Sequence, residues 1–181
     1  FENYGVLEVK KVAYEYGVTA QTVYKHINYL EAHKKIQKIK SGRHNSYILL
    51  PELTLENTYP LENLTEDECL KRDFHPILKL LPQIANSVFS YVFLEMLNNA
   101  IEHSEGKRVY VRAMKNAYAV SCVISDNGIG IFTKVQNTLG LSEKRYAILE
   151  LAKGKFTSDP DSHTGEGIFF SSKAADEFVI L

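Results

Sequence analysis

The stretch from Ile84 to Gly106 constrains the fold most, because it predicts one long amphipathic helix. Apolar residues recur at four-residue spacing in two adjacent rows, which is the pattern of a helix that buries a wide face. The rows are Ile84, Val88, Val92, Met96 and Ala100, and Ala85, Phe89, Phe93, Leu97 and Ile101. The rest of the chain is expected to pack around this helix.

The opposite face of the predicted helix is polar. It carries Tyr91, Glu95, Asn98, Asn99, Glu102 and His103. Glu95 and Asn99 are one turn apart and point the same way. Two interpretations stay open for the helix alone: it presents a carboxylate and a carboxamide to a ligand, or it is an ordinary helix with a solvated face.

Two glycine-containing motifs follow the helix. Residues 109–114 and 118–124 alternate in polarity and are joined by Lys115–Ala117, which predicts an antiparallel hairpin. The second strand ends in Asp-Asn-Gly-Ile-Gly, Asp126 to Gly130. Thr-Gly-Glu-Gly-Ile, Thr164 to Ile168, then opens a helix that runs to about Ala175.

Taken in this order, Glu-x-x-x-Asn-Ala, Asp-x-Gly-x-Gly and a late Gly-x-Gly resemble the ATP-binding domain of DNA gyrase, mismatch-repair ATPases, sensor histidine kinases and anti-sigma-factor serine kinases, the GHKL superfamily. The resemblance covers residues 66 to 181. It implies that ATP and Mg²⁺ are the ligands. It also implies a two-layer α/β sandwich with a mixed, mostly antiparallel sheet, and family sheets continue with further strands beyond the point where this chain stops at Leu181.

The resemblance also implies residue roles. Asp126 would read adenine, since an ionised carboxylate only accepts hydrogen bonds and so suits the exocyclic amine. Asn99 would bind magnesium, and Glu95 would act as the general base. The remaining expected nucleotide contacts are Gly128, Gly130, Thr164, Gly165, Gly167, Asn98 and His103. The helix that Gly167 opens would place N–H groups against phosphates.

Some of these positions have alternatives. Glu95 could instead pair with a lysine such as Lys107. The Thr-Gly-Glu-Gly-Ile motif lacks the third glycine of the commoner family pattern. Glu166 lies between its two glycines and adds negative charge near a polyanion, so we expect it to point away. The loop before this motif carries Lys153, Lys155, Thr157, Ser158 and His163, where the family has its lid, or it is a solvated loop.

Charge divides the chain into two parts. Residues 1–50 hold eight Lys and Arg against four Glu, whereas residues 51–181 hold thirteen against eighteen Asp and Glu. This split predicts two modules, the first with a polyanionic partner.

The basic part predicts two helices, Val6–Tyr16 and Ala20–His33, joined by a short turn at Gly17 with Thr19 as N-cap. Residues 36–39 and 47–50 predict two strands of a hairpin. This sequence resembles bacterial winged helix-turn-helix domains. The resemblance implies contacts to duplex DNA from Gln21, Thr22, Tyr24, Lys25, Asn28 and, on the wing, Arg43. A winged helix used for protein contact or dimerisation is the alternative.

The predicted fold is therefore α+β: a winged helix-turn-helix domain over 1–50, a linker over 51–64 and the ATP-binding domain over 65–181. The linker is predicted from its two prolines and lack of periodicity. In the second domain, Thr65–Glu68 predicts a capping box, Ser142–Lys153 a helix and Phe178–Leu181 one more strand. The chain begins with Phe1, so we expect it to be a piece of a longer protein.

Cysteine usage and the absence of a long apolar run indicate the cellular compartment in which we expect the protein. Cys69 and Cys122 show no disulfide or metal-ligand spacing, which is typical of free thiols in a reducing cytoplasm. No stretch has the length and apolarity of a membrane span. We expect a cytoplasmic ATP-binding regulator that couples nucleotide state to DNA binding or to a protein partner. The alternatives are a serine/threonine kinase that phosphorylates a partner and an ATP-hydrolysing switch that forms a homodimer.

Overall fold

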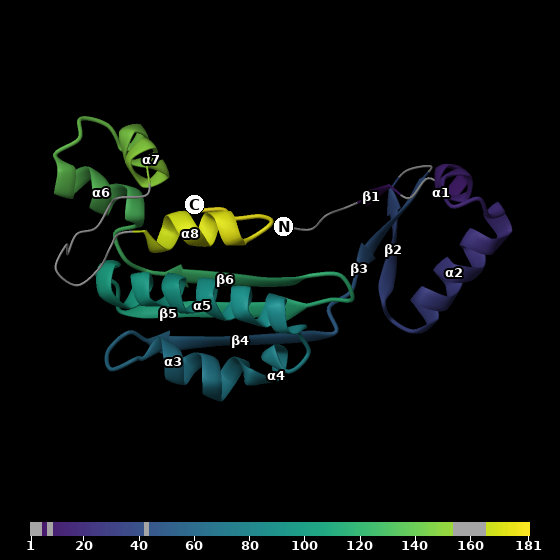
Figure 1. The fold of residues 1–181 in the computed structure, drawn as a ribbon, viewed down its shortest axis with the longest axis horizontal. Helices are drawn as coiled ribbons and strands as arrows, with labels where there is room; N and C mark the ends of the chain where they lie inside the picture. The colour runs from purple at the N-terminus through teal and green to yellow at the C-terminus, as the bar shows by residue number, and fades with distance from the viewer. Residues whose placement is uncertain (1–4, 7–8, 42–43, 154–165) are drawn as a thin grey trace. The chain divides into compact units, whose positions relative to one another are not determined.

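The computed structural model describes residues 5–6, 9–41, 44–153 and 166–181, and its elements are helices and small antiparallel sheets of the α+β class. The chain divides into two compact units. Unit 1 comprises residues 1–54 and 114–120, and unit 2 comprises residues 55–113 and 121–181. Figure 1 labels the elements of both.

Unit 1 contains two helices and a three-stranded sheet. The helices are α1 (Val9–Glu15) and α2 (Ala20–Ala32), and the strands are β1 (Gly5–Val6), β2 (Ile36–Ser41) and β3 (His44–Leu49). The sheet order is β1-β3-β2 with antiparallel pairing. The predicted first helix was too long, because Val6 pairs with Ser46 in the sheet instead of joining the helix.

Helix α2 begins as its sequence predicts. The Thr22 N–H donates to Thr19 Oγ1 at 3.1 Å, which satisfies one of the free amides at the helix start. Val23 and Ile27, one turn apart, are buried and form the core of the unit with the β2–β3 hairpin. An apolar hollow of about 300 Å³ lies beside this core and is lined by Val12, Val23, His26, Ile27, Leu30, Ile36, Tyr47, Ile48 and Leu49.

Most of the second sheet, of order β4-β5-β6 (Leu53–Pro60, Arg108–Lys115 and Val120–Asp126), belongs to unit 2, and one end of each strand falls in unit 1. Backbone bonds at both ends, Glu52 to Lys115 and Leu61 to Lys107, make β4 and β5 antiparallel. Strands β5 and β6 are also antiparallel, because backbone bonds join Asn116 to Ala119 at one end of the pair and Asn127 to Arg108 at the other. The described sheets therefore contain antiparallel pairs only, and the predicted mixed sheet is not found among the described residues.

The predicted linker was wrong, because residues 53–60 form strand β4. Leu53 and Leu55 alternate with exposed residues and Tyr59 is buried, which is the pattern of a strand with one covered face. The two prolines that suggested a linker stand before the strand and at its last residue, where a missing N–H costs no ladder bond.

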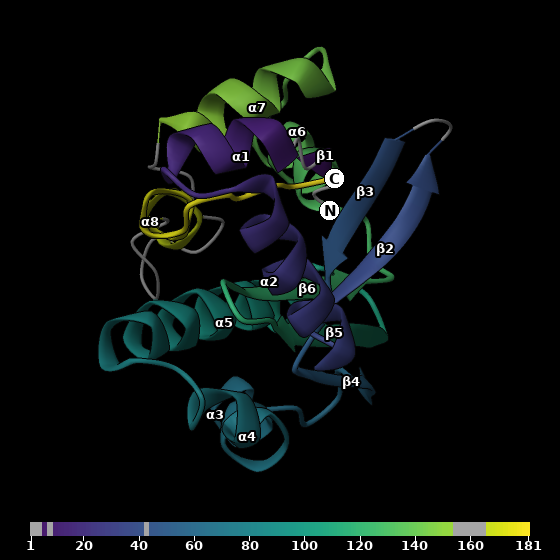
Figure 2. The same cartoon turned by 90° about the vertical axis from the view of Figure 1, so that its right-hand side faces the viewer.

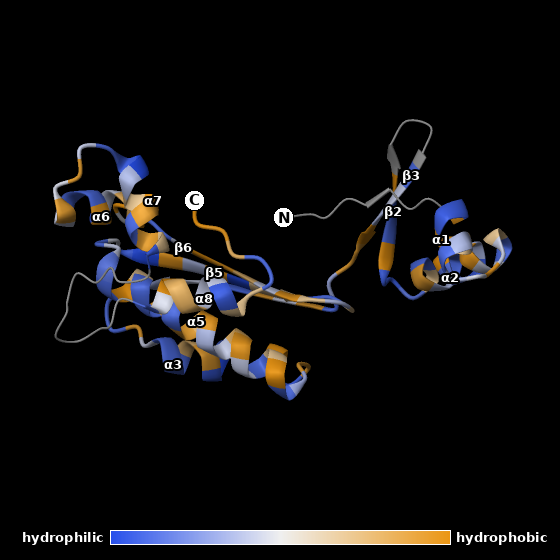
Figure 3. Ribbon diagram, turned by 45° about the horizontal axis from the view of Figure 1, so that its top comes forward, coloured by the Kyte–Doolittle hydropathy of each residue, from blue (hydrophilic) through white to orange (hydrophobic). Residues whose placement is uncertain are grey.

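The long helix α5 (Gln83–His103) packs on one face of this sheet, as Figures 1 and 2 show. Its row of Phe89, Phe93 and Leu97 is buried together with Ala100. The other predicted row is less covered, and Ile84 is 81% exposed. Apolar residues run along this helix and the strands that it covers (Figure 3).

Between β4 and α5 the chain stays helical from Glu66 to Leu78 as α3 (Glu66–Cys69), the π-helical segment η1 (Leu70–Phe74) and α4 (His75–Leu78). Thr65 precedes the helix as predicted but makes no capping bond with its side chain. Pro76 does not end the helix; it falls in the first turn of α4, where its lack of an N–H is tolerated. Phe74 packs on Phe93, with ring centroids 5.1 Å apart.

Among the described residues after β6 there are three helices: α6 (Ile131–Leu139), α7 (Lys144–Ala152) and α8 (Gly167–Ala174). Helix α6 was not predicted, and α7 is shorter than the predicted Ser142–Lys153. Helix α8 packs against α5. The strand predicted over Phe178–Leu181 is wrong, because these residues form no strand.

Candidate functional site

Glu95 and Gly167, which the resemblance assigns to one ligand site, lie in contact. A Cβ atom added to Gly167 would stand 2.1 Å from Glu95 Oε2 and 3.2 Å from its carboxyl carbon. Gly167 is the first residue of α8, so the carboxylate lies at the positive end of that helix. The absence of a side chain at Gly167 is what allows this approach.

Two more polar groups stand near the same place. The charges of Glu95 and Glu166 both raise the pKa of Tyr91, although burial is the largest cause. Glu166 is half-buried and is the N-cap residue of α8. Tyr91 lies one turn before Glu95 on α5, so both carboxylates are close enough to this helix face to act on its hydroxyl group.

The Asp126–Gly130 loop is fixed to the C-terminal end of α5. The Ile129 N–H donates to the Ser104 carbonyl oxygen at 2.9 Å, and a Cβ on Gly128 would stand 2.0 Å from that oxygen. Ser104 follows the last residue of α5 and is buried. Only glycine allows the loop to lie this close to the helix end.

The loop is also held by its own side chains. Asp126 Oδ1 accepts a bond from the Gly128 N–H at 2.8 Å. Asn127 Oδ1 accepts bonds from the backbone N–H groups of Lys107, at 2.8 Å, and Arg108, at 3.0 Å. Asn127 was not among the predicted site residues, although it stands inside the motif; its amide aligns the loop with the start of β5.

Gly130 ends the loop with φ of 77° and is the N-cap residue of α6. This left-handed conformation favours glycine. From α6, Lys134 forms an ion pair with Glu105, the residue after Ser104. The loop is thus anchored to the end of α5 on both of its sides.

Asn98, Asn99 and His103 are half-buried on the last two turns of α5. Asn99 is five residues before Ser104, roughly 7.5 Å along the helix axis. His103 Nε2 lies 3.7 Å from Glu102 Oε2. The ion pairs among the described residues do not include one between Glu95 and Lys107, which was the alternative role for this glutamate.

Two of the predicted phosphate contacts, Thr164 and Gly165, lie outside the described residues, as do Lys155, Thr157, Ser158 and His163 of the preceding loop. Lys153 is described and pairs with Glu150 at 2.6 Å. Within the described ranges, no cluster of three or more His, Cys, Asp or Glu is placed to hold a metal ion.

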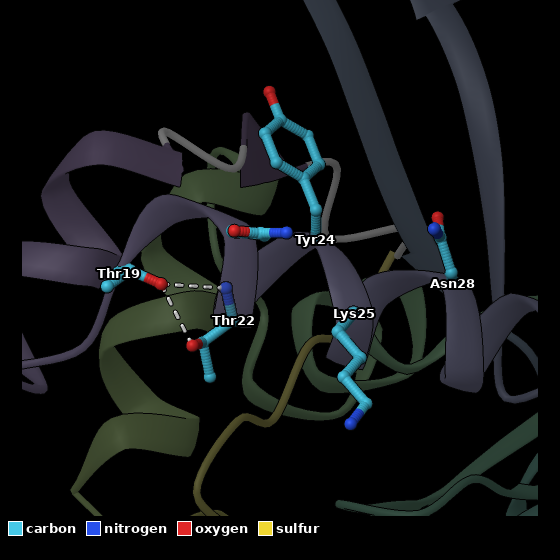
Figure 4. Close-up of a pocket in the computed structure, with 6 residues that line it drawn as sticks. Thr19, Thr22, Tyr24, Lys25 and Asn28 are labelled. Carbon is cyan, nitrogen blue, oxygen red and sulfur yellow. Dashed lines mark hydrogen bonds between the residues drawn. The ribbon is translucent and has the colours of Figure 1, made fainter.

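In unit 1, five of the six predicted DNA contacts line one surface hollow of about 480 Å³ on α2 (Figure 4). The lining residues are Thr19, Gln21, Thr22, Tyr24, Lys25 and Asn28. Arg43 lies outside the described residues. The Thr22 hydroxyl group already forms a hydrogen bond within the protein, with Thr19 Oγ1 at 3.0 Å. Tyr24, Lys25 and Asn28 project from the helix and are exposed.

Comparisons with protein-family models, with curated proteins and with solved structures found no match to this chain. None of the helices in the described ranges combines the length and apolar character needed to cross a bilayer.

Proposed function

We propose that the chain is an ATP-binding regulatory protein in which unit 2 binds ATP with magnesium and unit 1 binds duplex DNA. The observation that supports this most is that two separate motifs meet one helix. Gly167 lies against Glu95 in the middle of α5, and Gly128 lies against Ser104 at its end. Asn99 stands between these two contacts along the helix.

The residues between these contacts suit an adenine nucleotide. Asp126, half-buried at the end of β6, accepts hydrogen bonds and would select the exocyclic amine of adenine over the oxygen of guanine. The N-terminus of α8 offers N–H groups to a phosphate. Magnesium supplies charge neutralisation when bound and usually has few protein ligands, so Asn99 together with phosphates and water is a suitable donor set.

A proposal of phosphoryl transfer, either to a protein partner or to water, is favoured by the position of Glu95. A general base must lie near the phosphate. The carboxylate of Glu95, on α5, lies against the N-terminal end of α8, where the phosphate is proposed to bind. Glu95→Gln should then retain ATP binding and lose turnover. If turnover persists in Glu95→Gln, the chain senses nucleotide without using this residue as a base.

Magnesium dependence tests the nucleotide site. ATP affinity is measured with magnesium and with a chelator for the wild type, Asn99→Ala and the control Asn137→Ala, which changes an exposed residue of α6. We expect magnesium to tighten binding in the wild type and the control but not in Asn99→Ala. Equal magnesium effects in all three proteins would contradict the assigned role of Asn99.

Duplex DNA is the proposed partner of the exposed face of α2. Tyr24, Lys25 and Asn28 combine an aromatic ring, a cation and an amide on one helix face, which suits phosphates and base edges in a major groove. The +4 balance of residues 1–50 adds attraction to a polyanion. Lys25→Ala should reduce the slope of log affinity against log salt by about 0.9. Lys144→Ala, in an exposed position of α7, should leave the slope unchanged.

A further inference from the structure

Glu52 joins two lysines that are distant in the sequence. Its Oε1 accepts a bond from Lys35 Nζ at 2.6 Å, and its Oε2 accepts one from Lys115 Nζ at 2.7 Å. The Glu52 N–H also donates to the Lys115 carbonyl oxygen at 2.6 Å. We name these three side chains the Glu52 bridge; all three belong to unit 1.

The bridge connects the end of α2 to the turn between β5 and β6. Lys35 follows α2 by three residues, and its N–H donates to the Leu30 carbonyl oxygen of that helix. Lys115 is the last residue of β5, and Asn116 closes the following turn by accepting bonds from the Tyr118 and Ala119 N–H groups. A helix that faces the proposed DNA and a turn of the hairpin are therefore held by one carboxylate.

Strand β6 starts beside this turn and ends at the proposed nucleotide site. Its first residue, Val120, belongs to unit 1 with the bridge, whereas its last residue, Asp126, belongs to unit 2. The strand pairs with β5, and backbone bonds from the Asn116 N–H to the Ala119 oxygen and from the Asn127 N–H to the Arg108 oxygen hold the two ends of the pair. Strand β6 is therefore the hydrogen-bonded segment of backbone that connects Asp126 to the turn held by the bridge.

The bridge is an ion pair between a charged carboxylate and two lysines, one of them largely buried. Hydrogen bonds from Lys115 and Lys35 lower the pKa of Glu52 to about 2, so the carboxylate stays charged under cellular conditions. The Lys115 side chain is 15% exposed. Breaking the bridge leaves that charge with the Asn116 carbonyl oxygen as its remaining partner, at 2.8 Å. Loss of the bridge is therefore expected to cost free energy, because it leaves a largely buried ammonium group with one acceptor.

We propose that the Glu52 bridge is the coupling element through which occupancy of the nucleotide site changes the affinity of unit 1 for DNA. This inference rests on the proposed function of both sites. Coupling requires a contact whose free energy differs between the nucleotide-bound and nucleotide-free states, and it acts equally in both directions.

The experiment measures four affinities of the full chain: DNA with and without ATP and magnesium, and ATP with and without DNA. The DNA probe is a pool of duplexes of randomised sequence. The variants are Glu52→Gln, which removes the central charge, and Lys115→Met, which keeps the aliphatic stem. Asp67→Asn, which breaks an exposed ion pair of α3 with Lys71, is the matched control.

We expect nucleotide to change the DNA affinity of the wild type and Asp67→Asn by about 5-fold or more, with the same factor in the reciprocal titration. In Glu52→Gln and Lys115→Met that factor should fall towards one, while each ligand alone binds within about twofold of the wild type. If nucleotide changes the DNA affinity of both bridge variants by the same factor as in the wild type, the inference is overturned, and the bridge has only a structural role.

Other outcomes separate the inference from the proposed function. If the wild type binds both ATP and DNA but neither ligand changes the affinity for the other, the two binding functions stand and the coupling role is rejected. If the wild type fails to bind ATP or DNA alone, the proposed function fails and the inference fails with it. Amide hydrogen exchange at residues 115–119 shows whether a bridge variant has lost only the local contact or the fold of the hairpin.

Discussion

The carboxylate of Glu95 lies so close to Gly167 that a single methyl group added there would stand 2.1 Å from Glu95 Oε2. The two residues are 72 positions apart, and their contact joins the middle of α5 to the start of α8. Because the atom that an added methyl group would meet is the end of a flexible side chain, we expect variants at both positions to fold, so that their coupling free energy can be measured.

Gly167→Ala and Glu95→Ala should therefore not be additive. In the wild type the new methyl group must displace the carboxylate, whereas in Glu95→Ala the carboxylate is gone and the Cβ of residue 95, at 3.9 Å, is at an ordinary contact distance. We expect a coupling free energy of about 0.5 kcal/mol or more from denaturant unfolding of the four proteins of the double-mutant cycle. Strict additivity would show that Glu95 does not lie against Gly167 in solution.

Gly128→Ala should destabilise unit 2 more than Gly140→Ala does. At Gly128 a Cβ would meet the Ser104 backbone, 2.0 Å from its oxygen and 2.6 Å from its carbon, and backbone atoms cannot move cheaply. At Gly140 the added atom has nothing within 4 Å, and only the left-handed φ of 61° opposes it, at a cost of about 1–2 kcal/mol. Urea unfolding compares the two; an equal or larger loss for Gly140→Ala contradicts the packing of the loop on Ser104.

The contribution of Glu52 should depend on pH. The pKa of this carboxyl group is lowered from 4.5 to about 2 by the two lysines, so its stabilising effect is present above pH 4.5 and is lost as the pH falls towards 2. The difference in urea midpoint between the wild type and Glu52→Gln should therefore be constant from pH 7 to pH 5 and shrink at lower pH. A difference that does not change with pH would show that the carboxylate is not ion-paired.

Both cysteines should react slowly in the folded protein. Burial raises the pKa of the Cys122 thiol to about 12 and also raises that of Cys69, whose side chain is fully buried. The thiolate is the reactive form, so alkylation near pH 8 should follow unfolding rather than the chemistry of an exposed thiol. Quantitative labelling with iodoacetamide, with and without urea, measures this; rapid labelling of Cys122 without urea contradicts its partly buried position on β6.

Long, strongly periodic segments were predictable from the sequence. Helices α2 and α5 and the β5–β6 hairpin are confirmed within a few residues, because their patterns extend over many positions. The contact of Gly167 with Glu95 was implied only by a resemblance, since no local pattern reveals which distant segments meet.

The errors have identifiable physical causes. Strand β4 was missed because its prolines suggested a linker, although they lie outside the strand interior. Helix α6 was missed although Ile131 and Val135 are one turn apart and Gly140 forms a left-handed C-cap, with φ of 61°. The strand at Phe178–Leu181 was overpredicted, since an apolar end forms a strand only when a neighbouring strand pairs with it.

Calorimetric titration of the chain with ATP and with GTP, in magnesium, tests the central claim most directly. We predict that the wild type and the control Asp67→Asn bind ATP and not GTP, and that Asp126→Asn loses at least about tenfold in ATP affinity because the adenine amine loses its charged acceptor. The amide oxygen of the new residue can still accept the bond from the Gly128 N–H, so the loop should keep its conformation. A wild-type trace without heat of binding for ATP, or equal ATP affinities for the wild type and Asp126→Asn, would contradict the account.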